Sequence, residues 1–205
     1  MKAIFKFLIE IGKLREIKRK GITFYGVKKP ARTSDHTFRM AMMVWLLSQE
    51  KKFDLLKALK MALVHDISKV LTGDITPYDG LLPKDKKERE EFVKRWRRLP
   101  MKEKEKRYLE KFHKEYQAIK KLTEKLPEKL KKEILKVWLD YHQGKSKEAK
   151  FVFQIDMVEN LLEAFEHWKQ NKNFPTQPWW EHTEEVIDDP LLLEFLKEIE
   201  KEEKK

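Results

Sequence analysis

The chain has 205 residues, enough for one sizeable domain with a hydrophobic core of its own. Hydrophobic and charged residues each make up 40% of it and only 6 residues are Gly, a balance typical of a folded, mostly helical protein and not of a disordered chain. It contains no Cys, which excludes disulfides, thiolate metal sites and cysteine nucleophiles and favours a reducing, cytoplasmic location.

The first twenty residues begin like a secretion signal but do not continue as one. Lys6 and Glu10 interrupt the apolar run, and no small-residue cleavage site follows. No run approaches the length of a membrane span, so we expect no membrane association. Apolar residues recur instead at helical spacing and predict a helix; they are Ile4, Leu8, Ile11, Leu14 and Ile17.

Two helices with clear start signals follow. Ser34 and Asp35 place a capping hydroxyl and an acid ahead of "HTFRMAMMVWLLSQE". Asp54 opens the next helix, "LLKALKMALVHDI", which is apolar on nearly every side and is therefore predicted to be central. A loop is then indicated by Thr72-Gly73-Asp74, Pro77, Gly80 and Pro83.

The middle of the chain carries most of the net charge of +11. Residues 84–136 hold 21 Lys and Arg against 11 Asp and Glu, so this surface could attract nucleic acid or a phosphorylated ligand. Acids and bases are closely interspersed there, which favours solvated helices over a nucleic-acid surface. We expect helices at about 84–97, 102–126 and 128–142. The aromatic residues of this region fall at packing intervals, not in a base-stacking array; they are Trp96, Tyr108, Phe112 and Tyr116.

The last third predicts two more helices. Ser146 caps a long one, "KEAKFVFQIDMVENLLEAFEHWKQ", and another begins at about residue 190. Between them, Pro175, Pro178 and two tryptophans indicate an irregular segment. With no strand pattern, repeat or linker, the sequence predicts an all-α helical bundle, one domain over 1–205 with a core of about 11–165 and a C-terminal helical extension of about 175–205.

Four side chains are suited to bind one divalent metal ion. His65 and Asp66 are adjacent at the end of the central helix. His36 lies one turn into the preceding helix, and Asp156 interrupts an apolar face where a carboxylate without a partner is costly to bury. Imidazole nitrogens and carboxylate oxygens both bind divalent transition metals at about 2.0–2.2 Å.

Each of these four residues also has an ordinary structural explanation. His36 fits a capping turn, and His65 fits a core histidine with satisfied hydrogen bonds. Asp66 fits a hydrogen-bonding residue at a helix end, and Asp156 fits an ion pair with a lysine. Four nitrogen and oxygen ligands on three helices, two of them adjacent, together favour the metal site.

The same residues carry a resemblance to a known family. The order His36, His65-Asp66, Asp156 resembles the H…HD…D signature of the HD-domain metal-dependent phosphohydrolases, in the branch of the bacterial 5′-deoxynucleotidases and HD-domain-containing protein 2. The resemblance extends over most of residues 11–165, and the matching stretches are "SDHTFRMAMM", "ALVHDISKVLTGDITP", "KEYQAI" and "EAKFVFQIDMVENLLEA".

This resemblance implies an HD-domain bundle in which the four residues bind one divalent transition metal, namely cobalt, manganese, nickel, zinc or iron. It implies a nucleotide substrate: a (deoxy)nucleoside 5′-monophosphate is hydrolysed to nucleoside and phosphate through a metal-activated water. It also implies a homodimer.

Two further residues gain roles from the resemblance. Arg19 corresponds to a guanidinium that grips the phosphate, a task that suits its planar pair of donors. It could equally be one more cation at a helix end. Asp74, in "LTGD", corresponds to an active-site acid that orients the attacking water or contacts the sugar, whereas its ordinary role is turn formation.

Lys69 departs from the family pattern. Close relatives read HD-x-x-E, with a glutamate that helps to activate the water, and this chain reads "HDISK". A protonated lysine is no such base, although it can bind phosphate, and burial could lower its pKa enough for acid–base work. It could also simply favour a helix C-terminus. The alternatives are therefore a different nucleotide substrate, such as a triphosphate or signalling nucleotide, or a metal-bound nucleotide- or nucleic-acid-binding protein with weak turnover.

Overall fold

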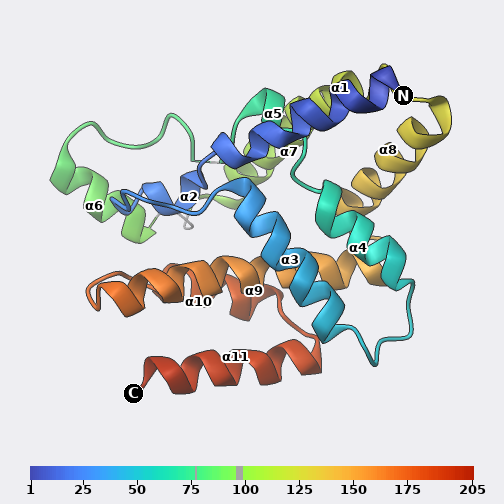
Figure 1. Ribbon diagram of the computed structural model, residues 1–205. Coiled ribbons are helices and arrows are strands. Elements are labelled where there is room, and N and C mark those ends of the chain that lie inside the picture. The colour runs from blue at the N-terminus through green and yellow to red at the C-terminus, as the bar shows by residue number, and fades with distance from the viewer. Residues whose placement is uncertain (77, 96–98) are drawn as a thin grey trace. The chain divides into compact units, whose positions relative to one another are not determined.

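The computed structural model describes residues 1–76, 78–95 and 99–205, and the chain in these ranges is largely helical (Figure 1). The described residues form no β-strand, and their only β-type pairing is an isolated bridge between Lys18 and Arg32. The all-α prediction is therefore confirmed. Pro77, Trp96 and the expected end of the helix at 84–97 lie outside the described residues.

The chain forms two compact units, each assembled from separate stretches of sequence. Unit 1 comprises Met1–Ser34 and Asp66–Leu135, and unit 2 comprises Asp35–His65 and Lys136–Lys205. The expectation of one domain over 1–205 stays a prediction. Among the described residues, none of the helices combines the length and the hydrophobicity that a membrane span requires.

Unit 1 is built around the short helix α5, which packs against α7 and against the 3-10 helix η1. Its interior holds apolar side chains from these elements and from the turn before α5, including Leu14, Ile67 and Ile119. The elements of this unit are α1 Lys2–Ile11, η1 Gly12–Glu16, α2 Lys20–Thr23, α5 Lys69–Thr72, α6 Lys86–Arg95, α7 Met101–Thr123 and the first residues of α8 Glu128–Gln143.

Unit 2 is built around α9, against which α4, α10 and α11 all pack (Figure 1). Many α9 residues are buried, among them Val152, Ile155 and Leu161, because neighbours cover the helix on several sides. The elements are α3 Thr33–Leu47 from Asp35 onward, α4 Leu55–Val64, the remainder of α8, α9 Lys147–Gln170, α10 Gln177–Val186 and α11 Pro190–Glu203.

The helix boundaries confirm some start signals and correct two expectations. Asp54 caps α4 by accepting the N–H of Lys57, and Ser146 caps α9 by accepting the N–H of Ala149. The expected irregular segment is wrong over residues 177–186, which form α10 with a proline in the first turn, where the missing N–H has no intrahelical partner anyway. The helix expected through residue 17 ends at residue 11 and continues as η1.

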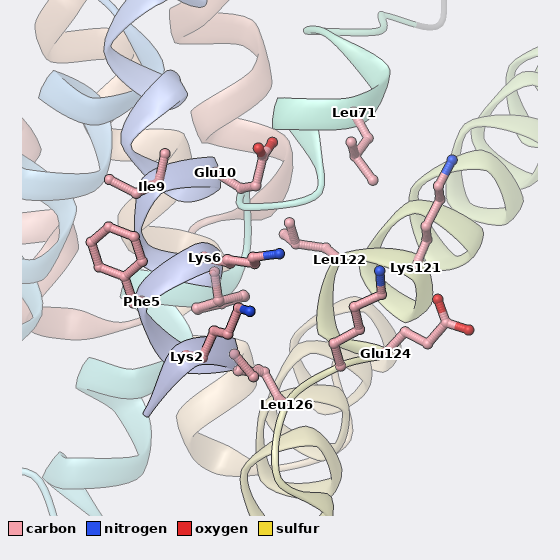
Figure 2. Close-up of a pocket in the computed structure, with 13 residues that line it drawn as sticks. Lys2, Phe5, Lys6, Ile9, Glu10, Leu71, Lys121, Leu122, Glu124 and Leu126 are labelled. Carbon is pink, nitrogen blue, oxygen red and sulfur yellow. The ribbon is translucent and has the colours of Figure 1, made fainter.

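Helix α1 presents an apolar row to the surface of unit 1. Phe5, Leu8 and Ile9 are 63%, 56% and 58% exposed, and no residue of α1 is buried. Beside this row lies a groove of about 750 Å³ whose apolar lining includes Phe5, Ile9, Leu71 and Leu122 (Figure 2). Lysines from α1 and from the end of α7 border it. An apolar row of this kind is a candidate contact surface.

Candidate metal centre

Two histidines from different helices of unit 2 face each other with their Nε2 atoms. His36 lies in α3, and His65 is the C-terminal capping residue of α4; both are buried. Their Nε2 atoms are 3.2 Å apart. The end of α4 is held in place because the buried Trp138 indole N–H donates to the His65 carbonyl oxygen at 3.1 Å.

The other nitrogen of each ring, Nδ1, contacts a hydrogen-bond acceptor. The acceptor is a carboxylate oxygen for one ring and a backbone carbonyl oxygen for the other. His36 Nδ1 forms a short hydrogen bond with a carboxylate oxygen of Glu159, and His65 Nδ1 lies 2.8 Å from the carbonyl oxygen of Ala62. The proton of each neutral ring therefore belongs on Nδ1, and both Nε2 lone pairs point into the same space. Two lone pairs at this distance repel unless a cation or a proton lies between them.

Glu159 is itself fixed by a charged partner. Its side chain is 1% exposed, and its Oε1 accepts a hydrogen bond from Arg39 Nε at 2.9 Å. The pKa of Arg39 is raised: burial alone would lower it, but the charges of Glu159 and Glu166 outweigh that effect. Arg39, Glu159 and His36 thus form a connected series that holds the imidazole in one orientation.

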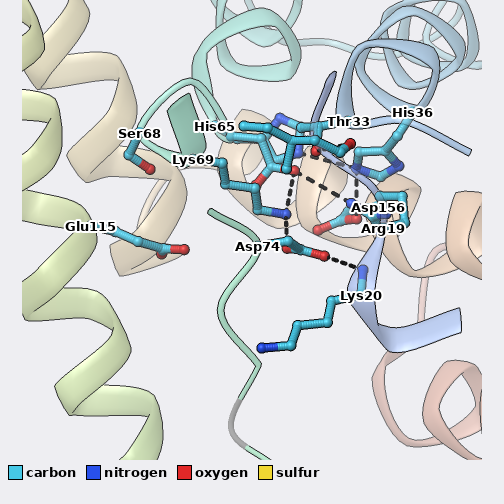
Figure 3. Close-up of polar contacts among 12 residues, drawn as sticks. Arg19, Lys20, Thr33, His36, His65, Ser68, Lys69, Asp74, Glu115 and Asp156 are labelled. Carbon is cyan, nitrogen blue, oxygen red and sulfur yellow. Dashed lines mark hydrogen bonds and ion pairs between the residues drawn. The ribbon is translucent and has the colours of Figure 1, made fainter. Parts of the chain in front are cut away.

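Asp156 brings a carboxylate from α9 to the same point (Figure 3). Its Oδ1 lies 3.3 Å from His36 Nε2 and accepts a hydrogen bond from Asn160 at 2.9 Å. Its Oδ2 accepts the hydroxyl proton of Tyr141 at 2.7 Å. Asp156, Glu159 and Asn160 share one face of α9 because positions three and four apart are neighbours on a helix.

These side chains fit a divalent transition metal. Among the described residues, His36, His65 and Asp156 each offer one ligand atom, and the three atoms lie within 4.8 Å of one another. Two imidazole nitrogens and a carboxylate oxygen, each oriented by a further hydrogen bond, form a donor set typical of zinc, cobalt, nickel, manganese and iron sites. The structure thus brings together three of the four residues that the sequence predicted as ligands.

The fourth predicted ligand, Asp66, follows His65 directly in the chain and belongs to unit 1. Its Oδ2 lies 2.7 Å from Lys69 Nζ and 3.4 Å from Arg19 NH1. Asp74 joins the same group: its Oδ1 lies 2.7 Å from Lys69 Nζ, and its Oδ2 accepts the backbone N–H of Lys20 at 2.6 Å (Figure 3). All four predicted residues of unit 1 therefore form one ion-pair cluster, consisting of Arg19, Asp66, Lys69 and Asp74.

The charges in this cluster reinforce one another. Burial alone would lower the pKa of Lys69, but the carboxylates of Asp66 and Asp74 outweigh burial and raise that pKa above its usual value. Burial alone would raise the pKa of Asp74, but Lys69 and Arg19 lower it. Lys69 is thus an ammonium in this cluster, and the alternative of a lysine with a lowered pKa is contradicted.

Several residues of the two clusters were not singled out from the sequence. Glu159 and Asn160 had a signal, because they follow Asp156 at three and four residues on a largely buried helix. For Glu115 of α7, which is buried, the only sequence signal is its position in the stretch "KEYQAI". Burial raises the pKa of this carboxyl. Tyr141 and Arg39 had no signal, since both types are common on helix surfaces.

A comparison with protein-family models places these observations in a family. The model described as HD domain matches residues 11–190. The chain belongs to the HD-domain family. The match includes all of the residues that form the two clusters, and so the HD-domain signature predicted from His36, His65-Asp66 and Asp156 lies within it.

Curated HD-domain relatives cover nearly all of the chain. The 5′-deoxynucleotidase HDDC2 of mouse is 31% identical over 97% of this chain and 87% of its own length. The human protein of the same name is 30% identical over 98% and 86%. The protein of that name from Dictyostelium discoideum is 32% identical over 100% of both chains.

Solved structures share the fold. A conserved hypothetical protein from Pyrococcus furiosus superposes with a TM-score of 0.68 at 22% identity, covering 96% of this chain and 99% of its own. A predicted metal-dependent phosphohydrolase from Magnetospirillum magnetotacticum gives a TM-score of 0.57 at 23% identity, covering 80% and 72%. These likenesses support the HD-domain fold assignment.

Proposed function

We propose that this HD-domain chain is a metal-dependent phosphohydrolase that converts (deoxy)nucleoside 5′-monophosphates to nucleoside and phosphate. The observation that carries the proposal is the convergence of His36 Nε2, His65 Nε2 and an Asp156 oxygen on one point, with both Nδ1 atoms occupied elsewhere. The substrate class is supported by relatives named 5′-deoxynucleotidase that match over almost the whole chain.

The chain's own residues would hold the metal and keep its ligands oriented. His36, His65 and Asp156 would bind it, together with Asp66, which stays a prediction from the sequence. A bound divalent ion supplies positive charge for a phosphate oxygen and lowers the pKa of a coordinated water. Glu159 and the Ala62 carbonyl oxygen keep the two imidazole rings in the ligating tautomer.

Arg19 is proposed to bind the substrate phosphate. Its guanidinium is mostly buried and lies beside Asp66, which holds it in place, and a guanidinium carries five N–H donors in a rigid fork. Arginine suits phosphate because two parallel N–H groups match two oxygens. Charge neutralisation and in-line placement are the main requirements of phosphoryl transfer, which gives this residue a direct part in the reaction.

We propose that the chain is a homodimer that pairs through α1. The exposed apolar row of Phe5, Leu8 and Ile9 supports this. If two α1 helices cross antiparallel about a two-fold axis at Leu8, residue 6 of one copy opposes residue 10 of the other. Lys6 of each copy would then contact Glu10 of the other copy. These two ion pairs would border the apolar contact with complementary charges. The cytoplasmic location stays a prediction.

The activity is tested by phosphate release from deoxynucleoside and ribonucleoside 5′-monophosphates and triphosphates, with manganese or cobalt added. We expect the wild-type chain to prefer 5′-monophosphates, and His65→Ala to lose at least 100-fold in kcat/KM because a metal ligand is gone. His113→Ala, at an exposed site on α7, is the matched control and should retain full activity. Equal rates for wild type and His65→Ala, or no release by wild type with any metal, would refute the proposal.

A further inference from the structure

Lys69 is the centre of the ion-pair cluster in unit 1. Its side chain is 5% exposed, and its Nζ contacts Asp66 Oδ2 and Asp74 Oδ1 at 2.7 Å each. Asp66 lies in the turn before α5 and Lys69 is the first residue of α5, so the two are three residues apart and lie on the same side of the turn. Gly73 ends α5 with a φ of 69°, and the chain then turns so that Asp74 meets the same ammonium.

The charges around Lys69 balance without any further ion. Two carboxylates, Asp66 and Asp74, face two cations, Lys69 and Arg19. The buried Glu115 of α7 interacts electrostatically with this group and forms an ion pair with Lys111 at 3.7 Å. Without the ammonium, the two largely covered carboxylates of Asp66 and Asp74 would share one guanidinium, and a charge that is shielded from water and lacks compensation is unfavourable.

The position of Nζ is one that a metal ion could occupy. A divalent cation binds carboxylate oxygens at about 2.0–2.6 Å, slightly closer than the two ion pairs of Lys69. An ammonium between two carboxylates therefore supplies a bridging positive charge, one unit where a divalent ion supplies two, without needing an ion from solution. It also leaves no room for that ion.

We propose that the Lys69 ammonium is a built-in cation that positions Asp66 and Asp74 and takes the place of a divalent ion between them. Lys69 is thus a positioning residue: two of its three N–H groups are used by the two carboxylates, and it takes no part as a general base. This assignment replaces the expected catalytic role. The proposal rests on the proposed function in one respect only, namely that Asp66 and Asp74 belong to the active site of a phosphohydrolase.

The test counts manganese ions bound per chain, by electron paramagnetic resonance, in a His65→Ala background that removes a ligand of the candidate metal centre. His65→Ala alone should bind none tightly. Adding Lys69→Glu brings three carboxylates together and should create one manganese site, with affinity at least tenfold above the background. Adding Lys69→Arg keeps the cation and should create none, and Lys114→Glu, at an exposed site on α7, should also create none.

A second variant covers the case in which Lys69→Glu does not fold. Lys69→Gln removes the charge and keeps polarity, and manganese should raise its melting temperature by more than it raises that of wild type. The proposal is overturned if folded His65→Ala/Lys69→Glu binds no manganese, or if manganese stabilises Lys69→Gln no more than wild type. If these results are as expected and wild type hydrolyses no nucleotide, the proposed function fails and the role of Lys69 stands.

Discussion

At the scale of single residues, the candidate metal centre depends on groups that do not themselves offer a ligand. Glu159 fixes the proton of His36, and Tyr141 and Asn160 each donate to Asp156. Such partners commonly change metal affinity by about 10- to 100-fold when removed, because the ligand loses its orientation or its tautomer. Replacing one such partner therefore separates the effect of orienting a ligand from the effect of losing the ligand.

Glu159→Gln is expected to weaken metal binding by about 10- to 100-fold with all three ligand side chains still present. An amide in place of the carboxylate can donate to His36 Nδ1, and the proton would then move to Nε2, where it blocks ligation. Titration of the metal-free chain with cobalt measures the affinity. Glu166→Gln is the control, because Glu166 contacts Arg39 and not His36. Unchanged affinity in Glu159→Gln would show that the series from Arg39 to His36 has no effect on the site.

Two of the candidate ligands could be foreseen from the sequence because each polar side chain interrupts an apolar pattern. His65 ends an apolar helix, and Asp156 lies among apolar residues of α9. Tyr141 and Arg39 could not be foreseen, since their hydrogen bonds join residues far apart in the chain. The ammonium state of Lys69 depends on how the chain folds around it: burial alone would lower its pKa, and only the charges of Asp66 and Asp74, placed beside it by the folded turn, reverse the direction.

At the scale of elements, charged side chains join the N-terminal ends of α4 and α9. Glu148 of α9 accepts the N–H of Asp54 and an N–H of Lys57, each at 3.0 Å. Lys57 also contacts Asp140 at 2.6 Å. Burial would raise the pKa of Glu148, but these hydrogen bonds, the backbone donor of Asp54 first, lower that pKa to about 2.

Glu148→Gln is therefore expected to destabilise the fold at neutral pH and not in strong acid. A carboxyl whose folded pKa lies below its unfolded value of 4.5 stabilises the folded state above pH 4.5, and loses that contribution as the pH falls towards 2. We expect a loss of about 1 kcal/mol at pH 7, the usual net contribution of one intramolecular hydrogen bond. Urea unfolding of both proteins at pH 7 and pH 3 measures it. A constant difference between the two pH values would contradict the assigned pKa.

Helix starts with a side-chain cap could be predicted, as Asp54 and Ser146 show, because the capping interaction is local. The same local reasoning failed where one residue type has two uses. The residue type of Pro178 indicates an irregular segment, yet Pro178 lies in the first turn of α10, where a proline costs no hydrogen bond. Likewise the apolar spacing through residue 17 did not reveal the change from α1 to η1 at Gly12.

At the scale of the whole molecule, the exposed row of α1 predicts the state of association. Light scattering coupled to size exclusion should give the wild-type chain twice its mass of 24.9 kDa. Leu8→Glu should give the mass of one chain, because it places two acids at the proposed two-fold axis. Leu109→Glu is the matched control: Leu109 is 55% exposed on α7, far along the chain from α1, and should stay dimeric. A monomeric wild type would mean that α1 contacts a different protein or no partner.

The positive φ of Gly73 limits which substitutions this enzyme can accept next to Asp74. Its φ of 69° is open to glycine and disfavoured for side-chain-bearing residues, although no neighbouring atom would crowd a methyl group there. The constraint is thus purely torsional, and enlarging the surrounding space would not relieve it. A mutational library around Asp74 should keep Gly73 unchanged and vary solvent-facing residues such as Leu71. The backbone conformation of Gly73 thereby places the Asp74 carboxylate beside the Lys69 ammonium.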